Sequence, residues 1–122
     1  MKVAAGCILY LDNKILLGKR AKEPFKGMWS IVGGKVEEDE TIEDCVRREI
    51  KEELGLEIEN LKFLASVPDG VNQGNLFIGK IKGSLNVNKN EILETKFFTM
   101  KEVKKIDMAF NHKELLLENW KK

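Results

Sequence analysis

The chain has 122 residues, which suits one compact domain and is too short for two ordinary ones, so we expect a single domain over residues 1–122. Hydrophobic residues make up 43% of the chain and charged residues 34%, a balance that excludes intrinsic disorder. With 21 Lys and Arg residues against 20 Asp and Glu residues, the formal net charge is +1, which argues against a partner such as a long nucleic acid.

The first third of the chain predicts a hairpin, a loop and a short strand. In chain order the expected elements are a strand over 3–11, a turn at Asp12-Asn13, a strand over 14–20, a polar loop over 21–28 and a short strand over 29–32 that ends at Gly33-Gly34. Cys7 and Cys45 are too few for a disulfide framework, so we expect two small buried residues.

Residues 41–54 have the pattern of one strong helix. Thr41 is the expected N-cap, and Gly55 is the expected C-terminal stop. One stripe of this helix is apolar and would dock it on a sheet; it consists of Val46, Ile50 and Leu54.

The rest of the chain predicts more strands and a second helix. The strands are expected over 61–67, 75–81 and 96–99, and an amphipathic helix over 113–120. Strands that surround a central helix predict an α/β or α+β fold with a mixed sheet. No apolar stretch is long enough to span a bilayer, and no export signal is evident, so a soluble cytoplasmic protein without a membrane partner is expected.

The charges are unevenly distributed along the chain. Residues 34–56 carry nine acidic and four basic side chains, a net charge of −5, whereas the segments before and after them have net charges of +4 and +2. At about 100° per residue, Glu49, Glu52 and Glu53 share one arc of the helix and can converge on one point. A divalent cation would relieve their repulsion, and all-oxygen ligands predict Mg²⁺ or Mn²⁺.

These residues also form a sequence motif. From Gly34 to Leu56 the chain reads Gly, five residues, Glu40, seven residues, Arg48-Glu49-Ile50, Lys51, Glu52-Glu53, Leu54, Gly55, Leu56. This segment resembles the 23-residue signature of the Nudix hydrolase family, and the upstream residues, with Arg20 and Trp29, fit the strand and loop that usually precede it. The segment Gly33-Gly34-Lys35-Val36-Glu37 is similar to the opening of the motif in MutT-like members. The resemblance implies a Nudix fold: a mixed β-sheet sandwiched between helices, with the catalytic helix at about 41–54.

The resemblance implies a reaction and the residues that perform it. Family members use a divalent metal to cleave a phosphoanhydride bond in a nucleoside diphosphate linked to another group. Glu49, Glu52 and Glu53 are similar to the family's metal ligands, and the backbone carbonyl of Gly34 is a further one. Arg48 resembles the arginine that orients the acidic cluster, by pairing with Glu40. The general base is Glu49 in the motif, or Glu91 or Glu94 just before the strand at 96–99.

Residues outside the motif are candidates for substrate contacts. Arg20 and Lys19 end a strand next to the motif, where they would meet phosphates, although charges at such positions also serve solubility alone. Trp29 would stack on a nucleobase or pack in the core. His112, the only histidine, is expected to cap the last helix or to pack.

Several functions remain open at this point. A short chain of this type favours a MutT-like enzyme that hydrolyses nucleoside triphosphates or a small nucleotide conjugate. The alternative is an ADP-ribose or nucleotide-sugar pyrophosphatase, and Pro68 stands near the position expected for it. Val32 stands where the family often has a proline. The alternative of another class is a non-catalytic Nudix-fold module that senses a nucleotide, but such a module would be free to lose the three acids. Homodimerisation is common in the family.

Overall fold

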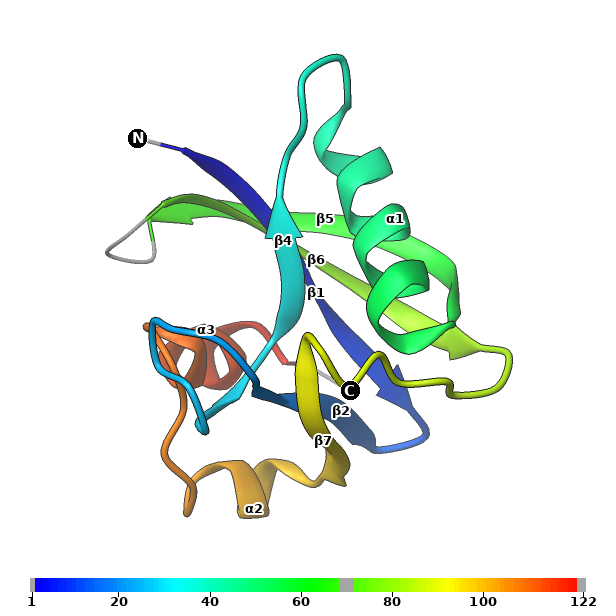
Figure 1. Ribbon diagram of the computed structural model, residues 1–122. Helices are drawn as coiled ribbons and strands as arrows, with labels where there is room; N and C mark the ends of the chain where they lie inside the picture. Colours follow the sequence, from blue (N-terminus) through cyan, green and yellow to red (C-terminus); the bar gives the residue numbers. More distant parts are fainter. Residues whose placement is uncertain (1, 69–71, 121–122) are drawn as a thin grey trace.

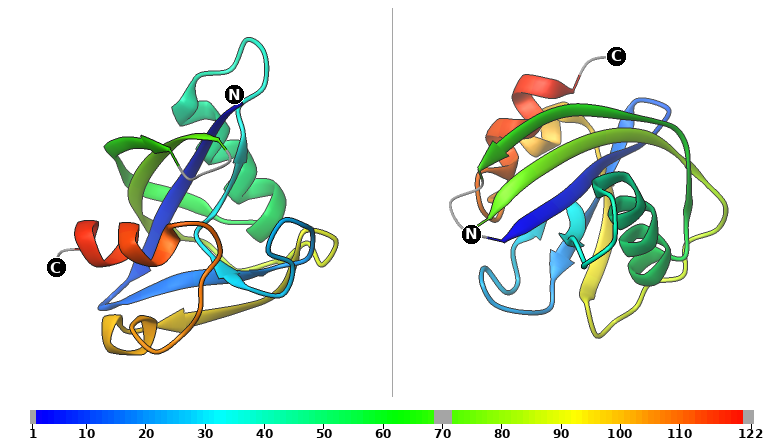
Figure 2. Two further views of the ribbon diagram at one scale, coloured as in Figure 1. Left: turned by 90° about the vertical axis from the view of Figure 1, so that its left-hand side faces the viewer. Right: turned by 90° about the horizontal axis from the view of Figure 1, so that it is seen from above.

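The computed structural model describes residues 2–68 and 72–120, and in this part of the chain strands form one sheet with helices on both of its faces (Figures 1 and 2). The strands are β1 (Val3–Leu11), β2 (Lys14–Arg20), β3 (Trp29–Ser30), β4 (Val32–Lys35), β5 (Glu57–Pro68), β6 (Gln73–Lys82) and β7 (Ile92–Phe98); the helices are α1 (Ile42–Leu54), α2 (Met100–Val103) and α3 (His112–Asn119). The expected fold class, a mixed sheet sandwiched between helices, is confirmed.

Strand β1 is the centre of the sheet. It pairs in parallel with β6 along nearly its whole length, from Val3 to Tyr10, so that the sheet is mixed. Its other edge is divided: residues 4–7 pair with β4, and residues 9–11 pair with β2, both antiparallel. Because β4 and β2 share this edge, the sheet forks beyond β1, and β4 is free to lead directly toward α1 (Figure 1).

Two apolar cores hold the helices on the sheet. On one face, Val46, Ile50 and Leu54 of α1 have 0% exposure and pack against alternate residues of β1 such as Cys7 and Leu9. The other face packs against α2 and α3, and its core is formed by Ile8, Leu17, Val103, Leu115 and Leu116 among others. The predicted apolar stripe of α1 is therefore confirmed. Cys7 and Cys45 are buried free thiols, as expected.

The ends of α1 match the sequence prediction. The Oγ atom of Thr41 accepts a hydrogen bond from the Asp44 N–H at 3.0 Å, which caps the first turn. At the other end, Gly55 has a left-handed φ of 71°, a conformation that glycine adopts without steric cost. Among the described residues, no helix is long and apolar enough to cross a membrane.

Other predicted boundaries were wrong. The single strand expected over 29–32 is two strands, β3 and β4, and β4 continues through Gly33-Gly34 instead of ending there. The reason is close strand pairing, because a Cβ atom on Gly33 would clash with the carbonyl oxygen of Ala5.

Strands β5 and β7 each begin four residues earlier than expected. The short helix α2 was not predicted; Thr99 and Glu102 form a capping box at its start.

Candidate active site

A cavity of about 590 Å³ lies where α1, the fork of the sheet and the segment before α3 meet. Glu49 and Glu53 of α1 line it together with Gly34 of β4. Arg20 at the end of β2 and Glu91 just before β7 form another part of its wall. The remaining wall includes Phe110, His112 and Leu115 at the start of α3. Five of these eight residues come from outside the Nudix-like motif, and only the fold brings them together.

Glu49 lies directly over the backbone of Gly34. A Cβ atom on Gly34 would clash with the Glu49 carboxyl group and would stand 2.8 Å from its Oε2 atom. The glycine is therefore required by a close approach of a side chain, since its own φ is not left-handed. This cradle places the carboxylate of Glu49 beside the β4 backbone, close to the carbonyl group of Gly34 that the resemblance names as a ligand.

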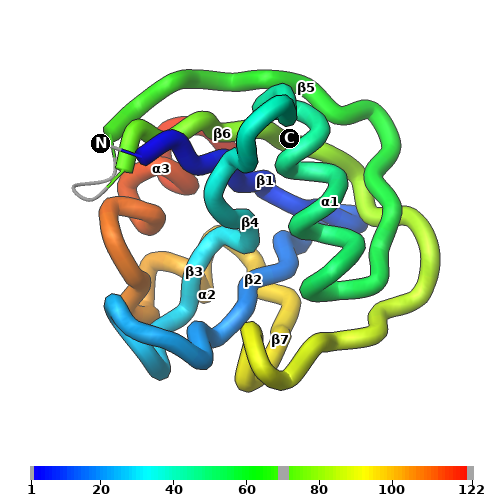
Figure 3. The backbone as a smooth tube through the Cα atoms, turned by 45° about the horizontal axis from the view of Figure 1, so that its top comes forward, coloured from blue at the N-terminus to red at the C-terminus, as the bar shows by residue number. Residues whose placement is uncertain are grey.

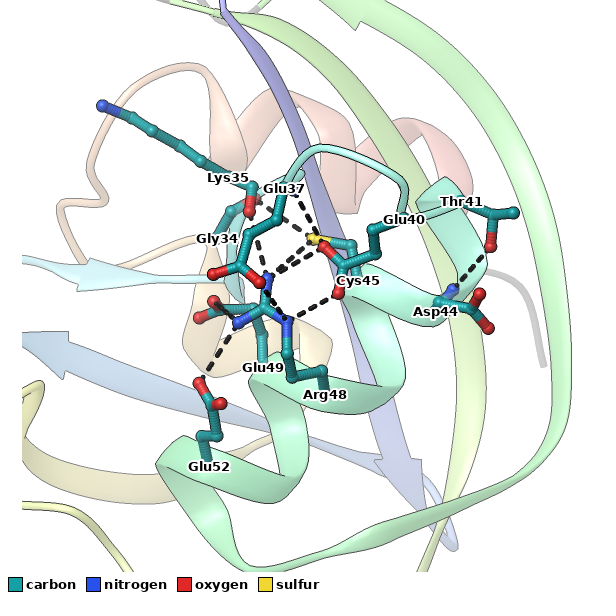
Figure 4. Close-up of polar contacts among 10 residues, drawn as sticks. All are labelled: Gly34, Lys35, Glu37, Glu40, Thr41, Asp44, Cys45, Arg48, Glu49 and Glu52. Atoms are coloured by element: carbon teal, nitrogen blue, oxygen red, sulfur yellow. Dashed lines mark hydrogen bonds and ion pairs between the residues drawn. The ribbon is translucent and has the colours of Figure 1, made fainter.

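Arg48 is the hub of the polar contacts on the neighbouring side of α1 (Figure 4). Its Nε and Nη2 atoms donate to the two carboxylate oxygens of Glu40 at 2.6 and 3.0 Å, a two-pronged pair. Its Nη1 atom donates to Glu49 at 2.6 Å and to Glu52 at 3.2 Å. The predicted pairing with Glu40 is therefore present, and the same guanidinium fixes the orientation of Glu49.

These contacts have an electrostatic effect on Glu40. Hydrogen bonds from Arg48, followed by one from the backbone of Glu37, lower the pKa of Glu40 to about 2. The Glu40 side chain is 12% exposed. Glu40 is thus a fixed anion that holds the Arg48 side chain.

Glu53 is in the opposite electrostatic situation. Burial is the main cause that raises its pKa, followed by a hydrogen bond and repulsion from Glu49. Glu91 raises the pKa of Glu53 further, whereas the positive charge of Arg20 lowers it. Two carboxyl groups that are half-buried and in contact require either a proton or a cation between them, which is the situation expected of paired metal ligands.

The third glutamate is placed differently from the prediction. The side chain of Glu52 is 59% exposed, pairs with Arg48 and does not line the cavity. Over residues 2–68 and 72–120, no three His, Cys, Asp or Glu side chains form a ready-made metal cluster. The reason is that Arg48 already engages both Glu49 and Glu52. The convergence predicted for three glutamates therefore holds for Glu49 and Glu53 alone.

The donor set nevertheless fits a divalent ion. Glu49, Glu53 and the carbonyl of Gly34 offer oxygen atoms only, which suits Mg²⁺ or Mn²⁺ and not Zn²⁺. Glu52 shares its hydrogen-bond donor, the Nη1 atom of Arg48, with Glu49. Because Gly34 has no Cβ atom, the carboxylate of Glu49 can lie directly against its backbone.

The loop before β7 ties Glu91 to the acidic end of α1. The backbone N–H of Asn88 donates to the carbonyl of Glu53 at 2.8 Å, and the N–H of Glu91 donates to the carbonyl of Asn88 at 3.0 Å. Glu91 lines the cavity and forms an ion pair with Lys22 at 3.1 Å. Glu94 is outside the cavity lining and pairs with Lys19 at 3.3 Å. Of the two candidates downstream of the motif, the structure brings Glu91 to the site.

Of the predicted substrate contacts, only Arg20 lines the cavity. Its Nε atom donates to the carbonyl of Pro24 at 2.6 Å. Lys19 lies 5.1 Å from the ring of Trp29, and that ring packs edge-on against Phe98 at 5.0 Å. Lys19 and Trp29 are therefore not brought to the acidic residues; Trp29 belongs to the core on the α3 face.

The sequence prediction missed part of the site near α3. His112 was expected to cap or pack, and its Nδ1 atom does accept a hydrogen bond from the Ile31 N–H at 3.1 Å. It also lines the cavity, together with Phe110. The signal that could have found them is the segment Phe110-Asn111-His112, which stands just where the last predicted helix begins.

Comparison with known proteins agrees with this geometry. A family model of the NUDIX domain matches residues 1–118. The ADP-ribose pyrophosphatase of Methanocaldococcus jannaschii is 38% identical over 127 aligned residues, which cover 98% of this chain and 74% of that protein. The chain belongs to the Nudix hydrolase family. The family and enzyme class expected from the acidic motif are thereby confirmed.

Other Nudix proteins show how far the likeness extends. A MutT NUDIX hydrolase from Burkholderia pseudomallei has a solved structure that superimposes with a TM-score of 0.77 at 28% identity, covering 98% of both chains. The human NAD-capped RNA hydrolase NUDT12 is 36% identical over 95 residues, which are 75% of this chain and 20% of that protein. Nudix hydrolases generally depend on divalent metal ions.

Proposed function

We propose that this Nudix hydrolase cleaves the diphosphate bond of a small nucleoside diphosphate conjugate of the ADP-ribose type, with Mg²⁺ or Mn²⁺ as cofactor. The observation that carries the proposal is the composition of one cavity. Glu49 and Glu53 lie at one part of its wall, the cation Arg20 lies at another, and the apolar and aromatic residues near α3 lie beyond it. A volume of about 590 Å³ is within the usual range for a small-molecule site.

The acidic residues would hold the metal. We assign Glu49, Glu53 and, after a rotamer change, Glu52 as carboxylate ligands, with the carbonyl of Gly34 as a further donor. A bound divalent ion supplies charge neutralisation of the diphosphate and a lower pKa of a bound water. Arg48 orients Glu49 through the contact at 2.6 Å, and Glu40 fixes Arg48 from the other side.

The substrate would lie between α1 and Arg20. The guanidinium of Arg20 suits phosphate oxygens, because its planar fork can donate two parallel hydrogen bonds. Ile31 and Leu115 offer an apolar surface for the less charged part of the substrate. Glu91 shares the cavity with Glu53, and we assign it as the general base that accepts a proton from the attacking water, with Glu49 as the alternative.

The sequence alone favoured a nucleoside triphosphate or a small nucleotide conjugate, and the names of the relatives support a conjugate of the ADP-ribose type. The archaeal relative, whose alignment covers 98% of this chain and 74% of that protein, is named an ADP-ribose pyrophosphatase. The human relative is named for NAD-capped RNA, whose NAD cap contains a diphosphate linkage as ADP-ribose does. The chain spans only a fifth of that protein. A cytoplasmic location and homodimerisation stay predictions.

The test is a substrate panel assayed with Mg²⁺ or Mn²⁺ and read by ³¹P spectroscopy. The panel contains ADP-ribose, NAD, a nucleotide sugar, nucleoside triphosphates and an NAD-capped RNA. We expect ADP-ribose to be cleaved to AMP and ribose phosphate, and Glu53→Gln to lower the rate at least about a hundredfold. Glu43→Gln removes an exposed carboxylate of the same helix, paired with Arg47 at 3.5 Å, and is expected to keep full activity.

The same panel distinguishes the alternatives. Faster cleavage of triphosphates than of ADP-ribose would favour a nucleoside triphosphate as the substrate. Tight binding of a nucleotide without cleavage of any compound would contradict the proposal and favour the sensor module. Cleavage of NAD-capped RNA but not of ADP-ribose would identify an RNA-end substrate.

A further inference from the structure

Contacts with Pro24 and Phe110 help to hold Arg20 on the cavity wall. Its Nε atom donates to the carbonyl of Pro24, and its guanidinium carbon lies 5.1 Å from the centre of the Phe110 ring. Both Arg20 and Phe110 line the cavity. The contacts come from segments far apart in the sequence: the loop after β2 (blue) and the segment that leads into α3 (orange), which run side by side in Figure 3.

The position of the Phe110 ring is itself enforced. Phe110 has a φ of 55°, in the left-handed region that bulky residues rarely adopt. Such a conformation persists only where its surroundings fix it, and it is found most often at functional sites. Here the ring is fixed by Phe25 at 4.8 Å, edge-on, and by the ring of His112 at 5.1 Å.

An arginine in this cavity needs such a restraint. Glu49, Glu53 and Glu91 line the same cavity, and Arg20 is within electrostatic reach of Glu53. A guanidinium that was free to move beside these carboxylates would pair with them and occupy the oxygen atoms that the proposed metal site needs. The face of an aromatic ring attracts the guanidinium cation. This contact uses the flat face of the guanidinium and does not use its N–H groups, which lie in its plane.

We propose that Phe110 is a positioning residue, whose ring holds the Arg20 guanidinium apart from the carboxylates and in place for the diphosphate of the substrate. The proposal rests on the proposed function, because it requires a diphosphate between α1 and Arg20. Phe110 acts through Arg20 and not by its own contact with the substrate. Its removal should therefore weaken substrate binding and leave the chemical step nearly unchanged.

The test compares Phe110→Leu, which keeps an apolar side chain, with Phe110→Tyr, which keeps the aromatic face. We expect Phe110→Leu to raise the KM for ADP-ribose about three- to tenfold with kcat within about twofold. Phe110→Tyr should restore the wild-type KM. The matched control is Phe63→Leu, which removes a half-exposed ring that packs on Phe77 and does not line the cavity. An equal rise in KM for Phe63→Leu would overturn the proposal, because the loss of a ring anywhere in the fold would then have the same effect.

A double-mutant cycle decides whether Phe110 acts through Arg20. In an Arg20→Gln background, Phe110→Leu should leave KM unchanged. The same proportional rise in both backgrounds would overturn the proposal, because Phe110 would then contact the substrate itself. If Phe110→Leu fails to fold, Phe110→Met takes its place in the cycle.

A binding measurement separates this inference from the proposed function. Calorimetric binding of ADP with Mg²⁺ needs no turnover, and we expect Phe110→Leu to weaken it by the same factor as KM. An enzyme that cleaves ADP-ribose but shows equal ADP binding in wild type and Phe110→Leu overturns the role of Phe110 alone. A wild-type protein that binds ADP, depends on Phe110 and cleaves nothing overturns the proposed function alone.

Discussion

Arg48 and Glu40 form a two-pronged ion pair, with Nε and Nη2 of the arginine 2.6 and 3.0 Å from the two carboxylate oxygens. Glu40 lies in the loop before α1, whereas Arg48 lies two turns inside the helix. The pair therefore ties the loop after β4 to the helix that carries the acidic residues. The same guanidinium contacts Glu49, so the pair also determines where that carboxylate points.

Arg48→Lys should lower activity although it preserves the charge. An ammonium group cannot reproduce the planar fork that engages Glu40 and Glu49 together. We expect kcat to fall about ten- to a hundredfold, as for other groups that orient metal ligands. The neighbouring Arg47→Lys is the control, since Arg47 is exposed and pairs with Glu43. Equal kcat values for wild type and Arg48→Lys would contradict the orienting role.

Glu40→Gln should change the pH dependence of stability. The pKa of Glu40 is lowered from about 4.5 to about 2 in the folded protein, mainly by hydrogen bonds from Arg48. Its stabilising contribution is therefore present above pH 4.5 and is lost as the pH falls from there toward 2. Urea unfolding should show Glu40→Gln less stable than wild type at pH 7, with a difference that shrinks at pH 3. A difference that is constant with pH would contradict the assignment.

The two adjacent glycines of β4 should respond differently to alanine. A Cβ atom on Gly34 meets the flexible end of Glu49, so Gly34→Ala should keep the fold and lower activity at least about tenfold by displacing that carboxylate. A Cβ atom on Gly33 meets the backbone of Ala5, which cannot move alone. Gly33→Ala should therefore lower the free energy of unfolding by about 1–3 kcal/mol. Thermal unfolding and kcat, measured on both variants, check the distinction.

Metal removal should abolish activity without unfolding the protein. The two cores consist of apolar side chains and include none of the acidic residues. The circular dichroism spectrum should therefore be unchanged by EDTA. Added Mn²⁺ should raise the Tm. At a free Mn²⁺ concentration of a hundred times its Kd, the free energy of unfolding should increase by about 2.7 kcal/mol. This rise should be lost in Glu53→Gln and kept in Glu43→Gln. A Tm that rises equally in all three proteins would place the ion elsewhere.

The sequence predicted those parts of the fold that local patterns determine. Helix α1 could be located because its cap, its stop and its apolar stripe all lie within fifteen residues. The β1–β2 hairpin follows from a short turn between two apolar runs. Strand β4 could not be predicted, because Gly33-Gly34 has the composition of a turn and becomes strand through the close approach of β1.

The candidate site divides in the same way. Helical spacing predicted that Glu49 and Glu53 converge, and the resemblance to the Nudix family predicted the orienting role of Arg48. Neither predicted that Glu52 would lie outside the cavity, because the side chain responds to Arg48 and to solvent as well as to helix geometry. Phe110 and His112 depend on contacts with Phe25 and Ile31, which are more than eighty residues away in the sequence.

The cavity thus has two walls that come from opposite faces of the sheet. The acidic wall belongs to α1 and its capping loops, and the aromatic wall belongs to the segment that enters α3. Since each wall packs against its own core, residues near α3 can be exchanged without repacking the helix that carries the acids. For protein engineering, substitutions in the segment that enters α3 would change which substrate is accepted. The acidic residues of α1 would stay in place under such selection.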